Sequence, residues 1–511
     1  MLSTRGRKHR HRVPRRPGLV AAGRQVLAGL WLGAALAPDA APAAPAAVVF
    51  EEVRSALQRA GVPEQALAFI VQDAASGRTL HEWQADLALN PASLSKLVTT
   101  QAALERLGPG YTWSTPVWLA GPVRDGGALD GSLHIRGSGD PTLVHERLWL
   151  LLRRVMQMGV REIRGDIVVD ASAFAVPEQP PGEFDGEPLR AYNVRPAALL
   201  LNYRAVIYSF TPDVAGGVAR VSVEPALART EVDRTVPLGT GPCGNWRAAL
   251  GAQFDTGTAE AGQAAPARPA ASAAEVRVRF AGRFPLACGE RSWALADSRP
   301  ASYDARLLEG LWLEMGGTLT GRVRDGPAPA GTPPTFERRS PSLAEVVHDI
   351  NKFSNNVMAE QLALTLAREA DPLVPATPLA ARALLQRWLA ERLGPASAAS
   401  AVVNNGSGLS RESRLSPRQL AQLLVLAHAS PTMPELMASL PVVAVDGTAR
   451  RVRAAAGRAH LKTGGLRDVA GLAGYVHAAD GRRLVFVALV NHPQAHAARA
   501  ALEVLLHKVA S

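Results

Sequence analysis

The chain of 511 residues contains two cysteines, and its aromatic fraction of 5% is low. It has no CxxC pair, no HExxH segment and no histidines and carboxylates at the spacing of a metal site. These absences argue against a metal centre. We therefore expect a function that uses neither a metal ion nor another cofactor.

Lysine is also scarce, since only five of the 56 basic residues are lysines. They are Lys8, Lys96, Lys352, Lys462 and Lys508. Arginine serves wherever a surface charge is sufficient. A lysine that is kept in such a chain indicates a need for a compact amine that can lose its proton.

The net charge of +11 is concentrated at the start of the chain, where eight basic residues precede the first acid, Asp39. An apolar run at 26–37 and an alanine-rich stretch at 40–47 follow, and this order is typical of a secretory signal peptide. We assign residues 1–43 to it, with cleavage within 37–46. The apolar run is too short for a permanent membrane helix, although an uncleaved anchor or arm is the alternative. Because the basicity belongs mostly to this leader, a nucleic-acid partner loses its support.

Export also bears on the two cysteines. In an exported protein a lone pair indicates a disulfide, here between Cys243 and Cys288. Two unrelated buried thiols are the alternative.

The pattern of apolar residues changes twice along the chain. Strands are predicted at 66–73 and 79–83, and a helix at 93–107. Short β-like runs fill 111–335, with a mobile loop at 256–273. Beyond residue 340 we predict helices at 343–366, 380–393 and 494–509, and strands at 460–463, 474–477 and 484–491.

This order predicts an α/β protein in which the two ends share one sheet with helices on its faces. The catalytic domain would comprise 47–110 and 336–511. Residues 111–335 would be an insertion of two smaller, mainly β domains.

Three short motifs occur in the order of an acyl-transferring serine site. They are SLSK at 93–96, SNN at 354–356 and KTG at 462–464. Each is weak alone, but two of the four lysines outside the leader occupy the two places that require lysine. The three motifs are predicted to lie at a helix start, at a break between helices and on a strand, so they can converge on one cleft.

The chemistry of each group suggests its role. Ser93 needs a base to become a nucleophile, and Lys96 lies one helical turn away. Burial and the charge of Lys462 would lower the pKa of Lys96 and so make it a base. Ser354 can then relay a proton to the leaving amine.

The remaining groups would hold the substrate. Lys462, Thr463 and Gly464 suit a terminal carboxylate, and Asn356 suits an amide of the acyl side. The backbone N–H groups of Ser93 and Gly465 are the expected oxyanion donors. Arg411 and Arg467 follow motif segments and can bind a second carboxylate, with a solvated surface role as the alternative.

Further segments carry a family resemblance: GSGDPTL at 137–143, NKFSNN at 351–356 and NGSGLS at 405–410. With these and the 261-residue interval from Ser93 to Ser354, the chain resembles the class C low-molecular-mass penicillin-binding proteins of the penicillin-binding protein 4 type. In this family Asp is expected where Asn405 precedes Gly406, so Asn405 is interpreted as a turn residue.

The resemblance implies an antiparallel sheet with helices on both faces, split by insertion domains. It also implies a periplasmic D-Ala-D-Ala carboxypeptidase or endopeptidase that acts on peptidoglycan peptides and is inhibited by β-lactams. A serine β-lactamase, which normally has a shorter interval between the first two motifs, is one alternative. A non-catalytic envelope protein is the other, although such proteins are expected to lose the serine or a lysine.

Overall fold

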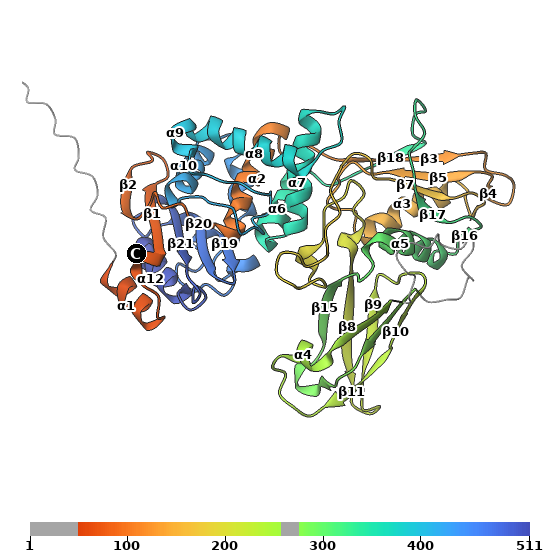
Figure 1. Ribbon diagram of the computed structural model, residues 1–511, viewed down its shortest axis with the longest axis horizontal. Coiled ribbons are helices and arrows are strands. Elements are labelled where there is room, and N and C mark those ends of the chain that lie inside the picture. Colours follow the sequence, from red (N-terminus) through yellow and green to blue (C-terminus); the bar gives the residue numbers. More distant parts are fainter. Residues whose placement is uncertain (1–49, 257–274) are drawn as a thin grey trace, which may run out of the picture. The chain divides into compact units, whose positions relative to one another are not determined.

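The computed structural model describes residues 50–256 and 275–511 (Figure 1). The predicted signal peptide and nearly all of the loop predicted at 256–273 lie outside these residues. None of the helices within the two described ranges is long and apolar enough to cross a bilayer.

A five-stranded sheet joins the two ends of the described chain (Figure 1). Its strands, in spatial order, are β19 (Ala459–Leu466), β20 (Val469–His477), β21 (Arg483–Asn491), β1 (Leu67–Asp73) and β2 (Thr79–Trp83). All neighbours are antiparallel, and β1 runs along β21 from the pair Leu67 and Val490 to the pair Asp73 and Leu484. The prediction that the chain ends share one sheet is confirmed.

Alternation along the strands explains why both faces of this sheet are covered. On β1, Ile70 points into one buried cluster, whereas Phe69 and Val71 point into another. Five longer helices share the cluster of Ile70: α2 (Lys96–Leu107), α6 (Leu343–Phe353), α7 (Asn356–Ala370), α8 (Pro378–Leu393) and α10 (Pro417–His428). The short α9 (Pro395–Ala398) and α11 (Met433–Ser439) lie beside them in sequence, while α1 (Glu51–Arg59) and α12 (Arg499–Ala510) cover the opposite face.

The final helix differs from its prediction. The sequence predicts a helix over 494–509, but α12 begins at Arg499. The preceding residues form turns, in which the amides of Gln494 and Ala495 bond to His492. Buried alanines recur in both the turns and the helix, so apolar spacing alone could not locate the start.

In the described part of its middle, the chain forms four further sheets. The first sheet contains, in spatial order, β17 (Val323–Asp325), β7 (Ile167–Asp170), β5 (Ser132–Arg136), β3 (Ser114–Ala120) and β18 (Phe336–Arg339), and the second contains β16 (Thr318–Leu319), β6 (Glu162–Ile163) and β4 (Ala128–Leu129). The third sheet contains β14 (Phe284–Pro285), β11 (Thr235–Gly239), β9 (Val218–Glu224), β8 (Ala205–Asp213) and β15 (Arg291–Ala296). The fourth contains β10 (Thr230–Val232), β13 (Val276–Phe280) and β12 (Ala252–Thr256). Strand β18 pairs with β3, so the first sheet extends just inside the range 336–511 that the sequence predicts to be catalytic.

This segment also contains helices that the sequence analysis does not predict. They are α3 (His145–Gln157), α4 (Trp246–Leu250) and α5 (Pro300–Glu314). On α3, Leu148, Leu151, Leu152 and Val155 are buried at helical spacing, and they pack in one cluster with the strands. The region is therefore mixed rather than largely β.

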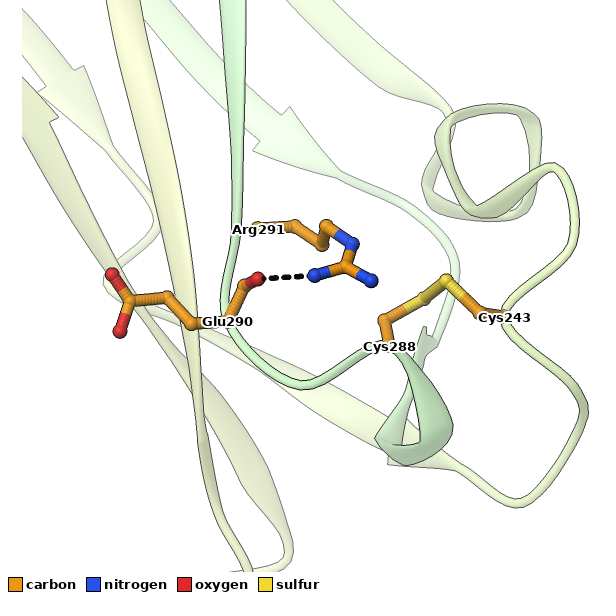
Figure 2. The surroundings of a disulfide bond; sticks show 4 residues. All are labelled: Cys243, Cys288, Glu290 and Arg291. Carbon is orange, nitrogen blue, oxygen red and sulfur yellow. Dashed lines mark hydrogen bonds between the residues drawn. A yellow bond between two sulfur atoms is a disulfide. The ribbon is translucent and has the colours of Figure 1, made fainter. Parts of the chain in front are cut away.

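The two cysteines form a disulfide, as predicted. Figure 2 shows Cys243, ahead of α4, joined to Cys288, which lies just before Glu290 and Arg291 at the start of β15. Cys288 is a buried member of the hydrophobic cluster of the middle segment, and the partly buried Cys243 packs against that cluster. The bond therefore ties a surface loop to that core.

Replacing both cysteines with serine is expected to lower the free energy of unfolding by up to about 4 kcal/mol, because the bond closes a loop of 45 residues in the unfolded chain. Denaturant unfolding of the wild type with and without a reductant provides the matched comparison. Equal stability of all three samples would contradict a structural role for the bond.

Candidate active site

The serine predicted as nucleophile lies in a tight turn at the start of a helix. Ser93 is in a single 3-10 turn, η2 (Ala92–Ser95), that continues directly into α2. The side chain of Asn90 holds this turn by accepting the Ala92 amide at 2.9 Å, and Asn491 at the end of β21 bonds to the Asn90 backbone. The central sheet thus fixes the position of Ser93.

Lys96 is the first residue of α2, and its side chain is fully buried. Its Nζ atom lies 3.1 Å from Ser93 Oγ, 2.7 Å from Asn356 Oδ1 and 2.7 Å from the carbonyl oxygen of Ser407. Two of these three partners, an amide oxygen and a peptide carbonyl, can only accept hydrogen bonds.

This set of partners orients the neutral amine. An uncharged lysine has two N–H bonds and one lone pair, and both N–H bonds are taken by Asn356 and the Ser407 carbonyl. The lone pair then faces Ser93, the one partner of the three with a hydrogen to give. The surroundings of Lys96 therefore favour proton transfer from the serine to the lysine.

The pKa values of the two motif lysines agree with this arrangement. Burial lowers the pKa of Lys96 to about 7, against the opposing influence of the Glu360 carboxylate. Burial, and next the charge of Lys96, hold the pKa of Lys462 well below its ordinary value. The two ammonium groups repel each other, and this repulsion disfavours the state in which both lysines are charged.

The second motif occupies a break between α6 and α7. Ser354 ends α6 in the left-handed conformation, with φ of 59°, which costs a non-glycine residue about 1–2 kcal/mol. Asn355 then caps α7 by accepting the Met358 amide, and Asn356 begins the helix facing Lys96. The strained turn thus brings the side chains of Ser354 and Asn356 toward the same site.

The third motif lies on the edge strand β19. The fully buried Lys462 places its Nζ atom 2.9 Å from Ser354 Oγ. Two residues on, a Cβ atom at Gly464 would lie 2.8 Å from the Pro91 carbonyl oxygen and 3.0 Å from Leu94 Cγ. Only glycine therefore allows β19 to approach the Ser93 turn this closely.

Three of the four lysines outside the leader are buried beside this site. Besides Lys96 and Lys462, Lys352 is 5% exposed and donates to Asp446 and to the Leu440 carbonyl. Lys508 is exposed and pairs with Glu52. This distribution supports the inference drawn from lysine scarcity.

Residues near β19 that the sequence analysis did not identify also contribute. Thr448 Oγ1 lies 2.7 Å from Thr463 Oγ1, so two hydroxyls stand together beside Lys462. The Lys352–Asp446 pair fixes the loop that carries Thr448. No sequence motif marks this loop. Thr448 could not be identified from the sequence, because only the folded structure places the loop next to Lys352.

Glu360 belongs to none of the sequence motifs. It lies one helical turn beyond Asn356 on α7, and its carboxylate accepts the Ser407 hydroxyl at 2.8 Å. The four-residue spacing from Asn356 is the signal that would have indicated it.

The two arginines predicted to bind substrate differ in their surroundings. Arg411 lines a cavity of about 580 Å³, pairs with Asp468 at 2.8 Å and lies 4.9 Å from the centre of the Phe184 ring. Arg467 is exposed in the turn between β19 and β20, next to Asp468. Neither arginine lies among the contacts of Ser93 and Lys96.

Across residues 50–256 and 275–511, no three or more histidine, cysteine, aspartate or glutamate side chains gather as metal ligands would. The groups that meet around Ser93 are a hydroxyl, amides and amines, which suit acyl transfer.

Comparisons with known proteins agree with this chemistry. The family model described as "D-Ala-D-Ala carboxypeptidase 3 (S13) family" matches residues 49–509. A D-alanyl-D-alanine carboxypeptidase of Actinomadura sp. is 30% identical over 453 residues, which cover 84% of this chain and 79% of that protein.

Two solved structures have a fold similar to that of this chain. Penicillin-binding protein 4 of Haemophilus influenzae is similar with a TM-score of 0.68 at 21% identity, over 89% of this chain and 100% of that one. Its complex with a β-lactam is similar with a TM-score of 0.65 at 20% identity, over 90% and 98%. The chain therefore belongs to the D-Ala-D-Ala carboxypeptidase 3 (S13) family and is a serine-type D-Ala-D-Ala carboxypeptidase.

Proposed function

We propose that the protein hydrolyses D-alanyl bonds of peptidoglycan peptides through an acyl-enzyme on Ser93. The observation that carries this proposal is the set of contacts at Lys96, whose amine meets Ser93 Oγ and two obligate acceptors. A pKa of about 7 leaves a substantial fraction of this amine neutral at physiological pH.

In the acylation step Ser93 Oγ attacks the carbonyl carbon of the penultimate D-alanine while its proton passes to Lys96. The backbone N–H groups of Ser93 and Gly465 hold the negative oxygen that forms. The C–N bond then breaks, and the proton taken up by Lys96 returns through Ser354 to the departing amine. Lys462, 2.9 Å from Ser354 Oγ, supports this relay. In the second step a water molecule attacks the ester carbon, its proton passes through Lys96 to Ser93 Oγ, and the C–O bond to Ser93 breaks.

Substrate binding uses the groups around β19. Lys462, Thr463 and Gly464 hold the terminal carboxylate, and Thr448 adds a second hydroxyl there. Asn356 holds an amide on the acyl side. Arg411, in the wall of the 580 Å³ cavity, and Arg467 bind a second carboxylate of the peptide.

The same acyl-enzyme serves a carboxypeptidase, which releases terminal D-alanine, and an endopeptidase, which opens cross-links. The protein would act in the periplasm after removal of residues 1–43, with 47–110 and 336–511 as the catalytic domain and 111–335 as its insertion. Acylation by β-lactams is part of this proposal, and the β-lactam complex of the Haemophilus influenzae protein supports it.

Mass spectrometry after incubation with penicillin tests the proposal. We expect one adduct, mapped to Ser93 and absent from Ser93→Ala, together with D-alanine release from a wall pentapeptide. An adduct on another serine would contradict the assignment. Rapid turnover of penicillin would favour a β-lactamase, and a protein that neither forms the adduct nor cleaves wall peptides would be non-catalytic.

A further inference from the structure

The Ser407 carbonyl, one of the two acceptors that orient Lys96, belongs to a loop with no regular secondary structure. Asn405 Oδ1 accepts the backbone amides of Ser407 and Gly408, at 3.2 and 2.8 Å. Thr99 on α2 donates to the carbonyl of Gly406 at 2.7 Å. The loop therefore depends on side-chain contacts to keep this carbonyl in place.

Glu360 supplies the contact from the other side of the loop. The Ser407 hydroxyl donates to Glu360 Oε1 at 2.8 Å, while the carbonyl of the same residue accepts from Lys96 Nζ at 2.7 Å. One residue thus links the carboxylate to the amine. Asn356, the other acceptor of Lys96, lies one turn before Glu360 on α7, so both acceptors depend on this helix.

We propose that Glu360 is a positioning residue for Lys96, which it orients by holding Ser407. The inference rests on the proposed role of Lys96 as the base, and it adds a residue that touches neither Ser93 nor the reacting atoms. The carboxylate would keep the Ser407 carbonyl directed at the amine, so that the lone pair of the neutral lysine stays on Ser93.

Electrostatics gives Glu360 a second influence. Burial raises the pKa of Glu360, while the Ser407 hydrogen bond and the positive charges of Arg195 and Lys96 oppose that rise. In return the carboxylate raises the pKa of Lys96, and Lys462 is a further titratable group whose pKa the charge of Lys96 lowers. Other charged residues in the cavity that Glu360 lines are Glu183, Arg195, Arg382, Arg411 and Glu412.

The test is the pH dependence of acylation by a chromogenic β-lactam. In the wild type the rate is expected to rise with pH, with a midpoint near the Lys96 pKa of about 7. Glu360→Gln keeps an oxygen that can accept from Ser407 but removes the charge. The midpoint should then fall by about one pH unit, the order of effect of a nearby charge, with the plateau rate nearly unchanged.

Two variants test the mechanical link. Glu360→Leu removes the acceptor, and its plateau rate should fall by about tenfold to 10²-fold, as expected for a misplaced catalytic group. Ser407→Ala keeps the charge but breaks the link, so its plateau should fall while its midpoint stays at the wild-type value. Circular dichroism and melting curves would verify that each variant is folded.

Glu369→Gln is the matched control, since it removes a carboxylate from the far end of α7, where Glu369 bonds to Tyr111. It should shift neither midpoint nor plateau. An unshifted Glu360→Gln midpoint, or a wild-type plateau in Glu360→Leu, would overturn the inference. If instead the wild type itself is not acylated on Ser93, the proposed function fails.

Discussion

Lys96→Arg is expected to lower the rate of Ser93 acylation by about 10³-fold, within the range attributed to a general base. The arginine side chain cannot lose its proton at any accessible pH, whereas burial lowers the pKa of Lys96 to about 7. A guanidinium would also present donors to Ser93 and no lone pair. Stopped-flow measurement of acylation by a chromogenic β-lactam gives the rate.

Because a guanidinium is larger than the fully buried amine it replaces, Lys96→Met is a second variant. Methionine is unbranched and neutral, so Lys96→Met should lose as much activity as Lys96→Arg while its fold stays intact. Lys508→Arg, at an exposed lysine paired with Glu52, is the control and should acylate at the wild-type rate. Activity within tenfold of the wild type in both Lys96 variants would exclude Lys96 as the base.

Gly408→Ala is expected to be the most damaging glycine substitution near the site. Gly408 has φ of +77°, and a Cβ atom there would lie 2.0 Å from the carbonyl oxygen of Ala92, the residue before Ser93. The backbone of the Ser93 turn would have to move. We expect acylation to fall by about 10²-fold, and stability by more than the 1–2 kcal/mol of left-handed strain alone.

Gly394→Ala separates the conformational strain at positive φ from the steric clash with the Ser93 turn. Gly394 has φ of +81°, but a Cβ atom there meets nothing within 4 Å. This variant should lose only the conformational part of the stability and none of the acylation rate. Denaturant unfolding and acylation rates would be measured on both proteins. Equal effects in the two would contradict the close approach of Gly408 to the Ser93 turn.

The sequence was most informative where local chemistry and local pattern decide the structure. The boundaries of β2 are those predicted, and β1 starts one residue late. The run of β1 is mostly apolar and ends at a turn, as expected for a strand that is buried on both faces. A break at Ser354 was predicted within the helical stretch 343–366, and the structure has it between α6 and α7. The scarcity of lysine indicated Lys96 and Lys462, and both side chains are fully buried.

Patterns that occur in more than one structure were less informative. Alanine spacing before Arg499 suits a helix or a series of turns. The leucines of α3 lie between β-like runs in the sequence, so this stretch was predicted as part of a β region and the helix was not predicted.

By itself, then, the sequence determined the three motifs, the shared sheet of the chain ends, the disulfide and the family. Only the tertiary structure decided that the Ser407 carbonyl receives Lys96, that Glu360 holds Ser407, and that Thr448 stands beside Thr463. These contacts join residues 311, 47 and 15 positions apart in the chain. Local pattern carries no information on such pairs, because packing of separate elements brings them together.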